Sequence, residues 1–396
     1  MMNETEIRLN GLLEKVEPSR SVTLLARVRQ MQAEDPSILN LTGGEPDFPT
    51  PKAVCDEVYR QMLEGCTHYG DSKGDPALRQ AIAEKLQREN GAPYEAEQIL
   101  VTPGGKYAIY VALQALVNPG DEVLWLAPGW VSYPAIVTLC GGRPVRVPLV
   151  YEENYAITAD LLEKYTTDST KVLCLNYPNN PTGKILTESD LAELRIWLRR
   201  HPGVQVLSDE IYEKILFDGH AHRTLAADPE FFSRVLLVNG FSKCSAMTGW
   251  RVGYLACSPE IYPGALKIFQ HSMSCTNSFV QKGALTALGL SEETEKMRAA
   301  YEHRRDLVFA GLAEIPRIEF RLPEGAFYAW VRFDTDLSPE ALCTRLLEKA
   351  GIGGIPGSAY GEEGGCMVRF CFAAADGVLE EFVRRLGCFC EKLRDA

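Results

Sequence analysis

Seven short apolar segments, most of them rich in β-branched residues, recur through the middle of the chain. They span residues 98–102, 121–127, 143–149, 171–176, 204–209, 235–240 and 252–257. Helix-length amphipathic stretches lie between most of them, for example 107–117 and 187–200; the second begins with TESD, an N-cap followed by an acidic first turn. Strands that alternate with helices predict an α/β fold with a mainly parallel seven-stranded sheet between helices.

The two ends of the chain have a different pattern. One helical stretch is expected at 21–32, and further helical patterns at about 279–313, 338–349 and 377–394 surround strand candidates at 318–322, 326–333 and 367–373. We therefore expect a large domain over 46–277 and a smaller α+β domain formed by 1–45 together with 278–396.

Composition narrows the classes of function. Acidic residues exceed basic ones by 53 − 41 = 12, so the overall field disfavours nucleic acid or an anionic membrane as the main partner. The first residues contain no basic region followed by an apolar run, and no stretch of 18 apolar residues exists. We expect a cytoplasmic protein without a transmembrane helix.

Cysteines and histidines give no metal-site pattern. The 12 cysteines include no CxxC pair, so free thiols are predicted. His220 and His222 have no carboxylate or cysteine beside them at ligand spacing. No metal is expected.

The most informative segment is NGFSKCSAMTGWRVGY, residues 239–254. Lys243 follows a predicted buried strand and lies in a loop rich in serine and glycine. An amine that loses water there has a lowered pKa and can attack a carbonyl to form a Schiff base. Arg251 offers a planar set of donors suited to a phosphate. A surface lysine beside a structural arginine is the competing interpretation of this segment.

Three more segments place polar groups at strand ends, where ligands of α/β sheets gather. Asp209 ends the strand 204–209, and a buried carboxylate there is costly unless a cation or a set of hydrogen-bond donors faces it; we expect a positive group. Asn180 lies in the turn NYPNNPTG after the strand 171–176, a pattern that a plain turn also explains. Gly104 and Gly105 lead into a helix whose free N–H groups can bind an anion, although neither a Walker loop nor GxGxxG is present.

Together these residues suit one ligand that carries a phosphate, a protonated ring nitrogen and an aldehyde. Pyridoxal 5′-phosphate has all three groups, and it binds proteins through a lysine Schiff base with an acidic partner for the ring nitrogen. The four segments therefore predict this cofactor.

The order of the motifs NPTG, DEIY, SK followed by TGWRVGY, and a late VRF resembles the class I/II aminotransferases of PLP fold type I, which include bacterial aspartate aminotransferases. The resemblance runs from LTGGEPDFPTP at 41–51 to Arg369. It implies an enzyme that moves an amino group from an L-amino acid to a 2-oxo acid, such as 2-oxoglutarate, in a ping-pong cycle.

The resemblance also implies roles for single residues. Lys243 corresponds to the lysine that bonds the cofactor and then moves a proton, and Asp209 to the partner of the ring nitrogen. Asn180 and Tyr212 match groups that bind the ring 3-oxygen, and Trp130 matches the aromatic residue stacked on the ring, although a core tryptophan is the other interpretation. The phosphate positions are Gly105, Lys106, Ser242 and Arg251, and the substrate positions are Gly44, Trp130, Asn180 and Arg369, which holds the α-carboxylate.

Two further points follow from the same resemblance. Tyr69 matches a tyrosine that reaches the phosphate from the neighbouring subunit, which implies a homodimer. Some members carry a hydroxyl residue three positions before the lysine, where this chain has Gly240. Phosphate binding is then expected to depend more on Ser242.

Alternatives remain open at this point. Lys106 either adds to the phosphate site or binds the side-chain carboxylate of a dicarboxylic substrate, and the second interpretation makes aspartate the first candidate donor. The same scaffold and lysine serve C–S β-lyases, which motifs alone do not distinguish. A non-catalytic regulatory protein that binds the same cofactor is a third candidate, which the net charge of −12 disfavours.

Overall fold

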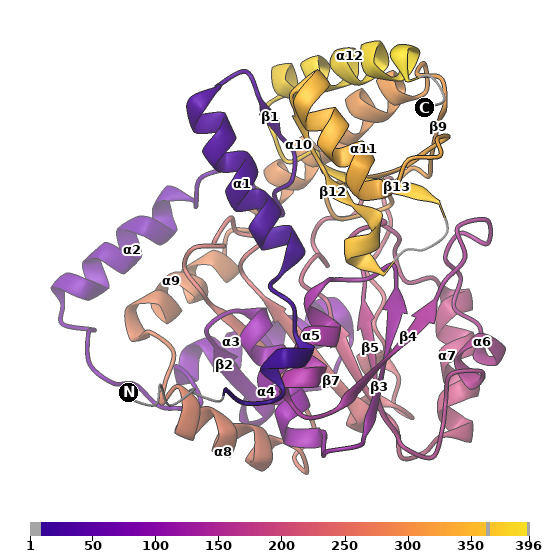
Figure 1. The fold of residues 1–396 in the computed structure, drawn as a ribbon. Coiled ribbons are helices and arrows are strands. Elements are labelled where there is room, and N and C mark those ends of the chain that lie inside the picture. Colours follow the sequence, from indigo (N-terminus) through magenta and orange to yellow (C-terminus); the bar gives the residue numbers. More distant parts are fainter. Residues whose placement is uncertain (1–8, 362–364, 394–396) are drawn as a thin grey trace, which may run out of the picture.

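The computed structural model describes residues 9–361 and 365–393. Its centre is a seven-stranded sheet in which β8 runs antiparallel to both of its neighbours and the other pairs are parallel (Figure 1). All seven predicted strands are present, and the mainly parallel sheet is confirmed. In spatial order they are β2 (Ile99–Thr102), β8 (Gly253–Ala256), β7 (Val235–Gly240), β6 (Gln205–Asp209), β5 (Thr170–Asn176), β3 (Glu122–Ala127) and β4 (Arg143–Pro148).

Helices cover both faces of this sheet because successive strand residues point to opposite sides. In β7, Leu237 joins one hydrophobic cluster, whereas Leu236 and Val238 join the other. The first cluster packs under α3 (Pro76–Lys85), α6 (Ala159–Glu163), α7 (Glu188–Arg200) and α9 (Ser278–Leu288), and the second under α4 (Gly105–Leu116), α5 (Ser132–Leu139) and α8 (Tyr262–Ser272).

A second core lies around a four-stranded antiparallel sheet. Its strands are β12 (Ile355–Pro356), β13 (Cys366–Cys371), β10 (Tyr328–Phe333) and β9 (Ile318–Phe320), and α10 (Ser291–Leu312), α11 (Pro339–Arg345) and α12 (Asp376–Lys392) accompany it. Near the N-terminus, α1 (Arg20–Glu34) leads to β1 (Leu39–Asn40), which pairs in parallel with β11 (Ile352–Gly353). The indigo α1–β1 segment and the yellow C-terminal elements therefore lie together in one smaller α+β unit (Figure 1).

The single helix expected over 279–313 is wrong, because the chain breaks at Gly289 and Leu290. Leu290 has φ −99° and ψ 53°, and α10 then starts afresh with acidic residues in its first turn. The helix before the break, α9, packs against α2 (Lys52–Leu63) and α3. We propose that α9 belongs to the large domain; the division into 46–277 and 1–45 with 278–396 otherwise stays a prediction.

Two further features agree with the sequence. All 12 cysteines are free thiols. Within the described residues, no helix combines the length and the apolar character that a membrane span requires.

Candidate active site

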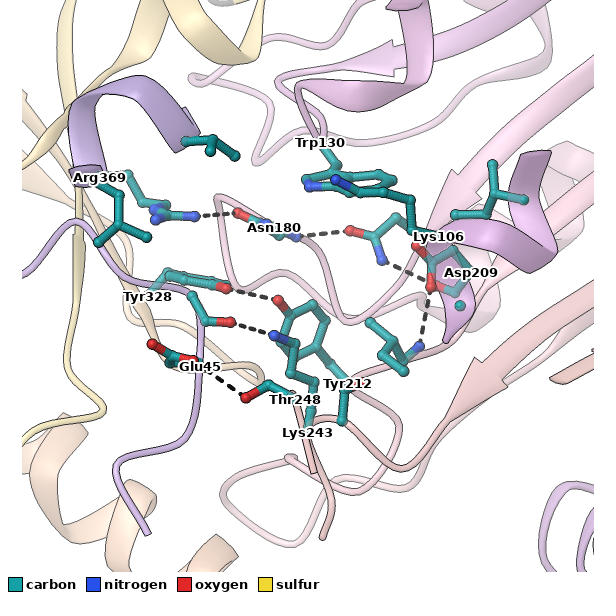
Figure 2. A pocket seen from close by; sticks show the side chains of 18 of the residues that line it. Glu45, Lys106, Trp130, Asn180, Asp209, Tyr212, Lys243, Thr248, Tyr328 and Arg369 are labelled. Carbon is teal, nitrogen blue, oxygen red and sulfur yellow. Dashed lines mark hydrogen bonds between the residues drawn. The ribbon is translucent and has the colours of Figure 1, made fainter. Parts of the chain in front are cut away.

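A cavity of about 470 Å³ opens where the carboxyl ends of β5, β6 and β7 meet the smaller unit (Figure 2). Eleven of the twelve predicted site residues line it: Gly44, Gly105, Lys106, Trp130, Asn180, Asp209, Tyr212, Ser242, Lys243, Arg251 and Arg369. Tyr69 does not, and it is 91% exposed on this chain. The strand ends at Asn176, Asp209 and Gly240 thus converge on one site, as expected for an α/β sheet.

Lys243 enters the cavity from the loop after β7. Its Nζ donates a hydrogen bond to the backbone oxygen of Gly44 and lies 5.9 Å from the ring centres of Tyr212 and Phe327. The loss of surrounding water lowers the pKa of Lys243 to about 8. A substantial fraction of this amine is therefore neutral slightly above neutral pH and able to attack a carbonyl carbon.

Asp209 is a buried carboxylate at the end of β6. Its Oδ2 accepts a hydrogen bond of 2.8 Å from the Tyr133 hydroxyl, and its Oδ1 accepts one of 3.3 Å from the backbone N–H of Ile211. Burial raises the pKa of Asp209 to about 6. No basic side chain in the described ranges forms an ion pair with it, so a cationic ligand group would remove the main cost of its charge.

The start of α4 forms an anion site with the loop around Arg251. Gly104 caps the helix at φ +86°, and a Cβ there would lie 2.5 Å from a guanidinium nitrogen of Arg251. Arg251 donates to the backbone oxygen of Thr248 at 2.8 Å and, among described residues, pairs with no carboxylate. The Ser242 hydroxyl also makes no hydrogen bond to a described residue. Free helix N–H groups, a guanidinium and a hydroxyl together suit a phosphate.

The absence of a side chain at position 240 has a packing reason. A Cβ on Gly240 would lie 2.8 Å from the Cα of Gly253 in β8. A Cβ on Gly253 would in turn lie 2.7 Å from the backbone nitrogen of Gly105. The three glycines bring β7, β8 and the start of α4 into direct backbone contact, and this contact leaves no room for a hydroxyl residue at 240.

Arg369 forms the opposite wall. It is 4% exposed, and its guanidinium donates to Asn180 Oδ1 at 3.0 Å and to the backbone oxygens of Thr42 and Gly43 at 2.7 and 2.9 Å. Its buried Nε has no partner, and no carboxylate of the described chain pairs with it. The guanidinium also lies 4.3 Å from the ring centre of Tyr328. A carboxylate ligand would supply the missing counter-charge.

Trp130 and Lys106 lie together at the edge of the cavity. The Lys106 Nζ is 4.9 Å from the ring centre of Trp130, and the amine makes no hydrogen bond or ion pair within the described chain. Burial by its neighbours, followed by the charge of Arg251, lowers the pKa of Lys106. Trp130 is half-buried and lines the cavity, which argues against a role confined to the core.

Sequence reasoning missed several residues of the site. Tyr133 binds Asp209, and Tyr328 places its hydroxyl 2.7 Å from that of the predicted Tyr212 (Figure 2). Glu45 accepts hydrogen bonds from Arg29 at 2.6 Å and from Thr248 at 3.2 Å. Of these residues, only Tyr133 could have been suspected from the sequence, because it lies three residues after the predicted site residue Trp130 in LAPGWVSYP.

One group of potential metal ligands lies close to the site, although the sequence spacing gave no hint of it. Folding brings ligand atoms of Glu210, Glu213 and His222 within 4.8 Å of one another. However, Lys85 pairs with Glu213, and His222 lies 2.7 Å from Glu210. Burial opposes the charge of His222, but the Glu210 carboxylate outweighs it and raises the pKa of His222. These groups already have partners, and we assign no metal to them.

Comparisons with known proteins agree with this geometry. Residues 36–386 match the family model described as aminotransferase class I and II. The aspartate aminotransferase of Musicola paradisiaca is 40% identical to this chain, over 97% of this chain and 96% of that relative. The structure of the aspartate aminotransferase from Rhizobium meliloti has a TM-score of 0.93 at 34% identity, with 98% and 100% of the chains covered. That of the Thermus thermophilus enzyme with maleate has a TM-score of 0.90 at 34% identity, with 96% and 99% covered.

A fold and a cavity of this kind define an α/β transferase of PLP fold type I. The chain belongs to the class I and II aminotransferases and is an enzyme that transfers amino groups.

Proposed function

We propose that the enzyme binds pyridoxal 5′-phosphate and transfers the amino group of L-aspartate to a 2-oxo acid such as 2-oxoglutarate in a ping-pong cycle. Relatives named aspartate aminotransferase, and a related structure with the dicarboxylate maleate, support aspartate as the donor. The β-lyase and regulatory alternatives have no specific observation in their favour in this cavity.

The observation that carries the cofactor proposal is the buried Asp209, which has no cationic partner in the described chain. A protonated ring nitrogen would provide that partner. The start of α4 with Arg251 and Ser242 would hold the phosphate, and the Tyr212 hydroxyl with Asn180 would hold the ring oxygen. The residues present therefore fit the cofactor's three polar groups.

When bound, the cofactor supplies an aldehyde that exchanges nitrogen with the substrate and a ring that accepts electrons from the substrate Cα. Lys243 would hold the cofactor through its Nζ and, once released, would take the proton from the substrate Cα and deliver it to the cofactor's former aldehyde carbon. Asp209 would keep the ring nitrogen protonated through its negative charge. Arg369 binds the substrate α-carboxylate with paired N–H groups and thereby fixes Cα for proton transfer.

Lys106 carries the proposal for a dicarboxylic substrate. Its ammonium has no fixed partner within the described chain, and it stands at the cavity edge beside Trp130. With Arg369 engaged by the α-carboxylate, Lys106 provides a second positive charge for the side-chain carboxylate of aspartate.

A donor screen tests the reaction. The purified enzyme is incubated with single L-amino acids and 2-oxoglutarate, and glutamate and ammonia are measured separately. We expect glutamate formation with the highest kcat/KM for aspartate. A neutral donor preferred over aspartate would overturn the choice of donor, and ammonia release without glutamate would indicate elimination instead of transfer.

Peptide mapping tests the cofactor site independently. After borohydride reduction, the pyridoxyl group is expected on Lys243. Its presence on Lys106 or Lys282 would overturn the assignment.

We further propose that the enzyme is a homodimer in which the partner subunit's Tyr69 contributes to the phosphate site. The exposed position of Tyr69 on the single chain supports this, since its ring and hydroxyl are accessible to a second subunit. The cytoplasmic location stays a prediction.

A further inference from the structure

A second cavity, of about 700 Å³, lies on the other side of the loop that carries Lys243. Ser242 and Lys243 line the active-site cavity, whereas Phe241, Cys244 and Ser245 line the second one. The remaining walls come mainly from the ends of β7 and α9 and from the start of α10. One short loop therefore separates the two cavities.

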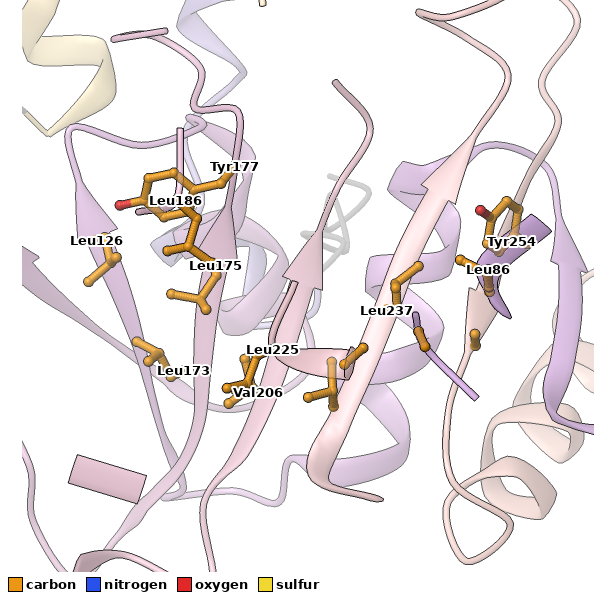
Figure 3. Packing of buried hydrophobic residues seen from close by; sticks show 14 of the residues in the cluster. Leu86, Leu126, Leu173, Leu175, Tyr177, Leu186, Val206, Leu225, Leu237 and Tyr254 are labelled. Carbon is orange, nitrogen blue, oxygen red and sulfur yellow. The ribbon is translucent and has the colours of Figure 1, made fainter. Parts of the chain in front are cut away.

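Two adjacent polar groups in the wall of this second cavity lack partners. Asn239 in β7 and Tyr254 in β8 are paired across the strands, so their side chains project from the same face of the sheet. Tyr254 is seen on that face beside Leu86 in Figure 3. Asn239 Oδ1 accepts a hydrogen bond of 2.7 Å from the backbone N–H of Gly240, which leaves Nδ2 as the donor.

This Nδ2 atom is buried and has no hydrogen-bond partner, and Asn239 as a whole is 2% exposed. The Tyr254 hydroxyl makes no hydrogen bond to any described residue either. A buried donor without a partner, such as Asn239 Nδ2, is costly, and a neighbouring hydroxyl can share one acceptor oxygen with it.

The charges around the cavity favour a ligand whose acceptor oxygen is neutral over one whose acceptor is a carboxylate. The ammoniums of Lys85 and Lys214 are already paired with Glu213 and Glu89, and four carboxylates in the wall face three ammoniums. Burial and then the nearby carboxylates raise the pKa of Tyr254, so its hydroxyl stays protonated. A carboxylate ligand would be repelled, whereas a neutral carbonyl oxygen accepts both hydrogen bonds without that cost.

Apolar groups complete the lining. The ring of Phe241 packs edge-on against that of Tyr254, with centroids 6.5 Å apart, and Ala287 and Leu288 face the same space. Beside the seven charged side chains of the wall, these apolar groups give a small molecule with an apolar body a surface to pack against.

We propose that this cavity is a second ligand site, which takes a small neutral amide or ketone with an apolar body. The carbonyl oxygen accepts hydrogen bonds from Asn239 Nδ2 and the Tyr254 hydroxyl, and the apolar body lies against Phe241 and Leu288. The site is distinct from the substrate cavity and would be present whichever amino donor the enzyme uses.

Acetanilide is the probe that tests the proposal, because it joins a carbonyl to a phenyl ring. Its binding to the purified enzyme is measured by saturation-transfer NMR, with and without saturating maleate. We expect saturable binding that maleate does not displace. Phenylacetate, in which a carboxylate replaces the amide, and ethylbenzene, which has no acceptor, should each bind more weakly by about tenfold.

Three variants locate the site. Tyr254→Phe removes one donor and should weaken acetanilide binding about two- to tenfold. Ser291→Trp, at an exposed position on the rim, should block entry without altering the interior. Tyr59→Phe removes an exposed hydroxyl on α2, outside both cavities, and should leave binding unchanged.

The proposal is overturned if acetanilide shows no saturable binding, if maleate displaces it, or if phenylacetate binds more tightly. It is also overturned if Ser291→Trp binds acetanilide as well as the wild type. That last result stands even if Tyr254→Phe fails to fold, because the rim variant leaves the packed interior intact.

Discussion

Tyr133 in α5 donates a hydrogen bond of 2.8 Å to Asp209 at the end of β6, so a neutral donor holds the buried carboxylate of the active site. Burial, followed by the charge of Asp209, raises the pKa of Tyr133 far above its usual value, which keeps this hydroxyl protonated. The bond thus orients the carboxylate for the ring nitrogen and stabilises its charged form.

Replacement of Tyr133 by Phe should therefore weaken cofactor binding. A hydrogen bond to a charged group contributes about 1.5–3 kcal/mol, so the dissociation constant of pyridoxal phosphate should rise about ten- to a hundredfold in a fluorescence titration. Tyr262→Phe is the matched control, because its hydroxyl donates to the backbone oxygen of Ile99 at 3.2 Å and Tyr262 does not line the active-site cavity. Wild-type affinity in Tyr133→Phe would show that other groups orient the carboxylate.

Asp209→Asn should affect stability and activity in opposite directions. Burial raises the pKa of Asp209 from 3.8 to about 6. The folded apoenzyme thus binds this proton more strongly than the unfolded chain does. As the pH rises from about 4 to about 6, ionisation of the buried carboxyl group therefore lowers the free energy of unfolding. The full effect, on the order of 3 kcal/mol, is present at pH 7.

Urea unfolding of the apoenzyme should accordingly show Asp209→Asn to be more stable than the wild type at pH 7, and by a smaller margin at pH 5. The same variant should lose most transamination, because it cannot balance a ring cation. A variant less stable than the wild type at pH 7 would mean that the carboxylate already has a cationic partner in the apoenzyme.

The pKa of Lys243 predicts how cofactor incorporation depends on pH. Burial lowers this pKa from 10.5 to about 8, and only the neutral amine attacks an aldehyde. The rate at which apoenzyme takes up pyridoxal phosphate, followed by absorbance, should rise with pH and level off above about pH 8. Lys282→Ala serves as the control and should give the same profile. A rate that keeps rising towards pH 10 would indicate an amine with an ordinary pKa.

Lys106→Ala distinguishes the two roles of that side chain. If Lys106 binds the substrate side chain, kcat/KM should fall about ten- to a hundredfold for aspartate and much less for phenylalanine. The dissociation constant of pyridoxal phosphate should stay close to that of the wild type, as it should for the surface variant Lys164→Ala. Equal losses for both donors, or a matching fall in cofactor affinity, would assign Lys106 to the phosphate.

Mixed dimers test whether subunits share the active site. Lys243→Ala and Tyr69→Phe should each be impaired alone, but a heterodimer contains one site in which both residues are wild type. Subunit exchange between the two variants should therefore restore part of the activity. A monomer in sedimentation, or no gain after verified exchange, would contradict the shared site.

Much of the fold could be predicted because the seven core strands are short apolar runs with clear turn residues between them. Their order could not. The antiparallel β8 lies between β2 and β7, and no local pattern encodes that neighbour relation. The break between α9 and α10 was also missed, because the apolar period continues across Gly289 and Leu290.

Of the predicted site residues, Asp209, Asn180 and Lys243 lie at or just after strand ends and share one cavity in the structure, while their roles stay predictions. Such a residue stands out against an apolar run. Tyr328 gives no comparable signal, because it reads as a core aromatic within β10 and its hydroxyl partner lies 116 residues away at Tyr212. Tertiary contacts of this kind become visible only in the folded chain.

The contact between Gly240 and Gly253 restricts how this active site can change during evolution. A hydroxyl residue at 240 first requires β8 to retreat, yet β8 also supports the start of α4 through Gly105. A single substitution at 240 would therefore displace the start of α4. The N–H groups of that helix end are the ones that would bind phosphate together with the new hydroxyl. A different arrangement of the phosphate-binding groups therefore requires coordinated substitutions at 240 and 253, whose separate effects on stability do not add. These two positions should covary among descendants of this sequence.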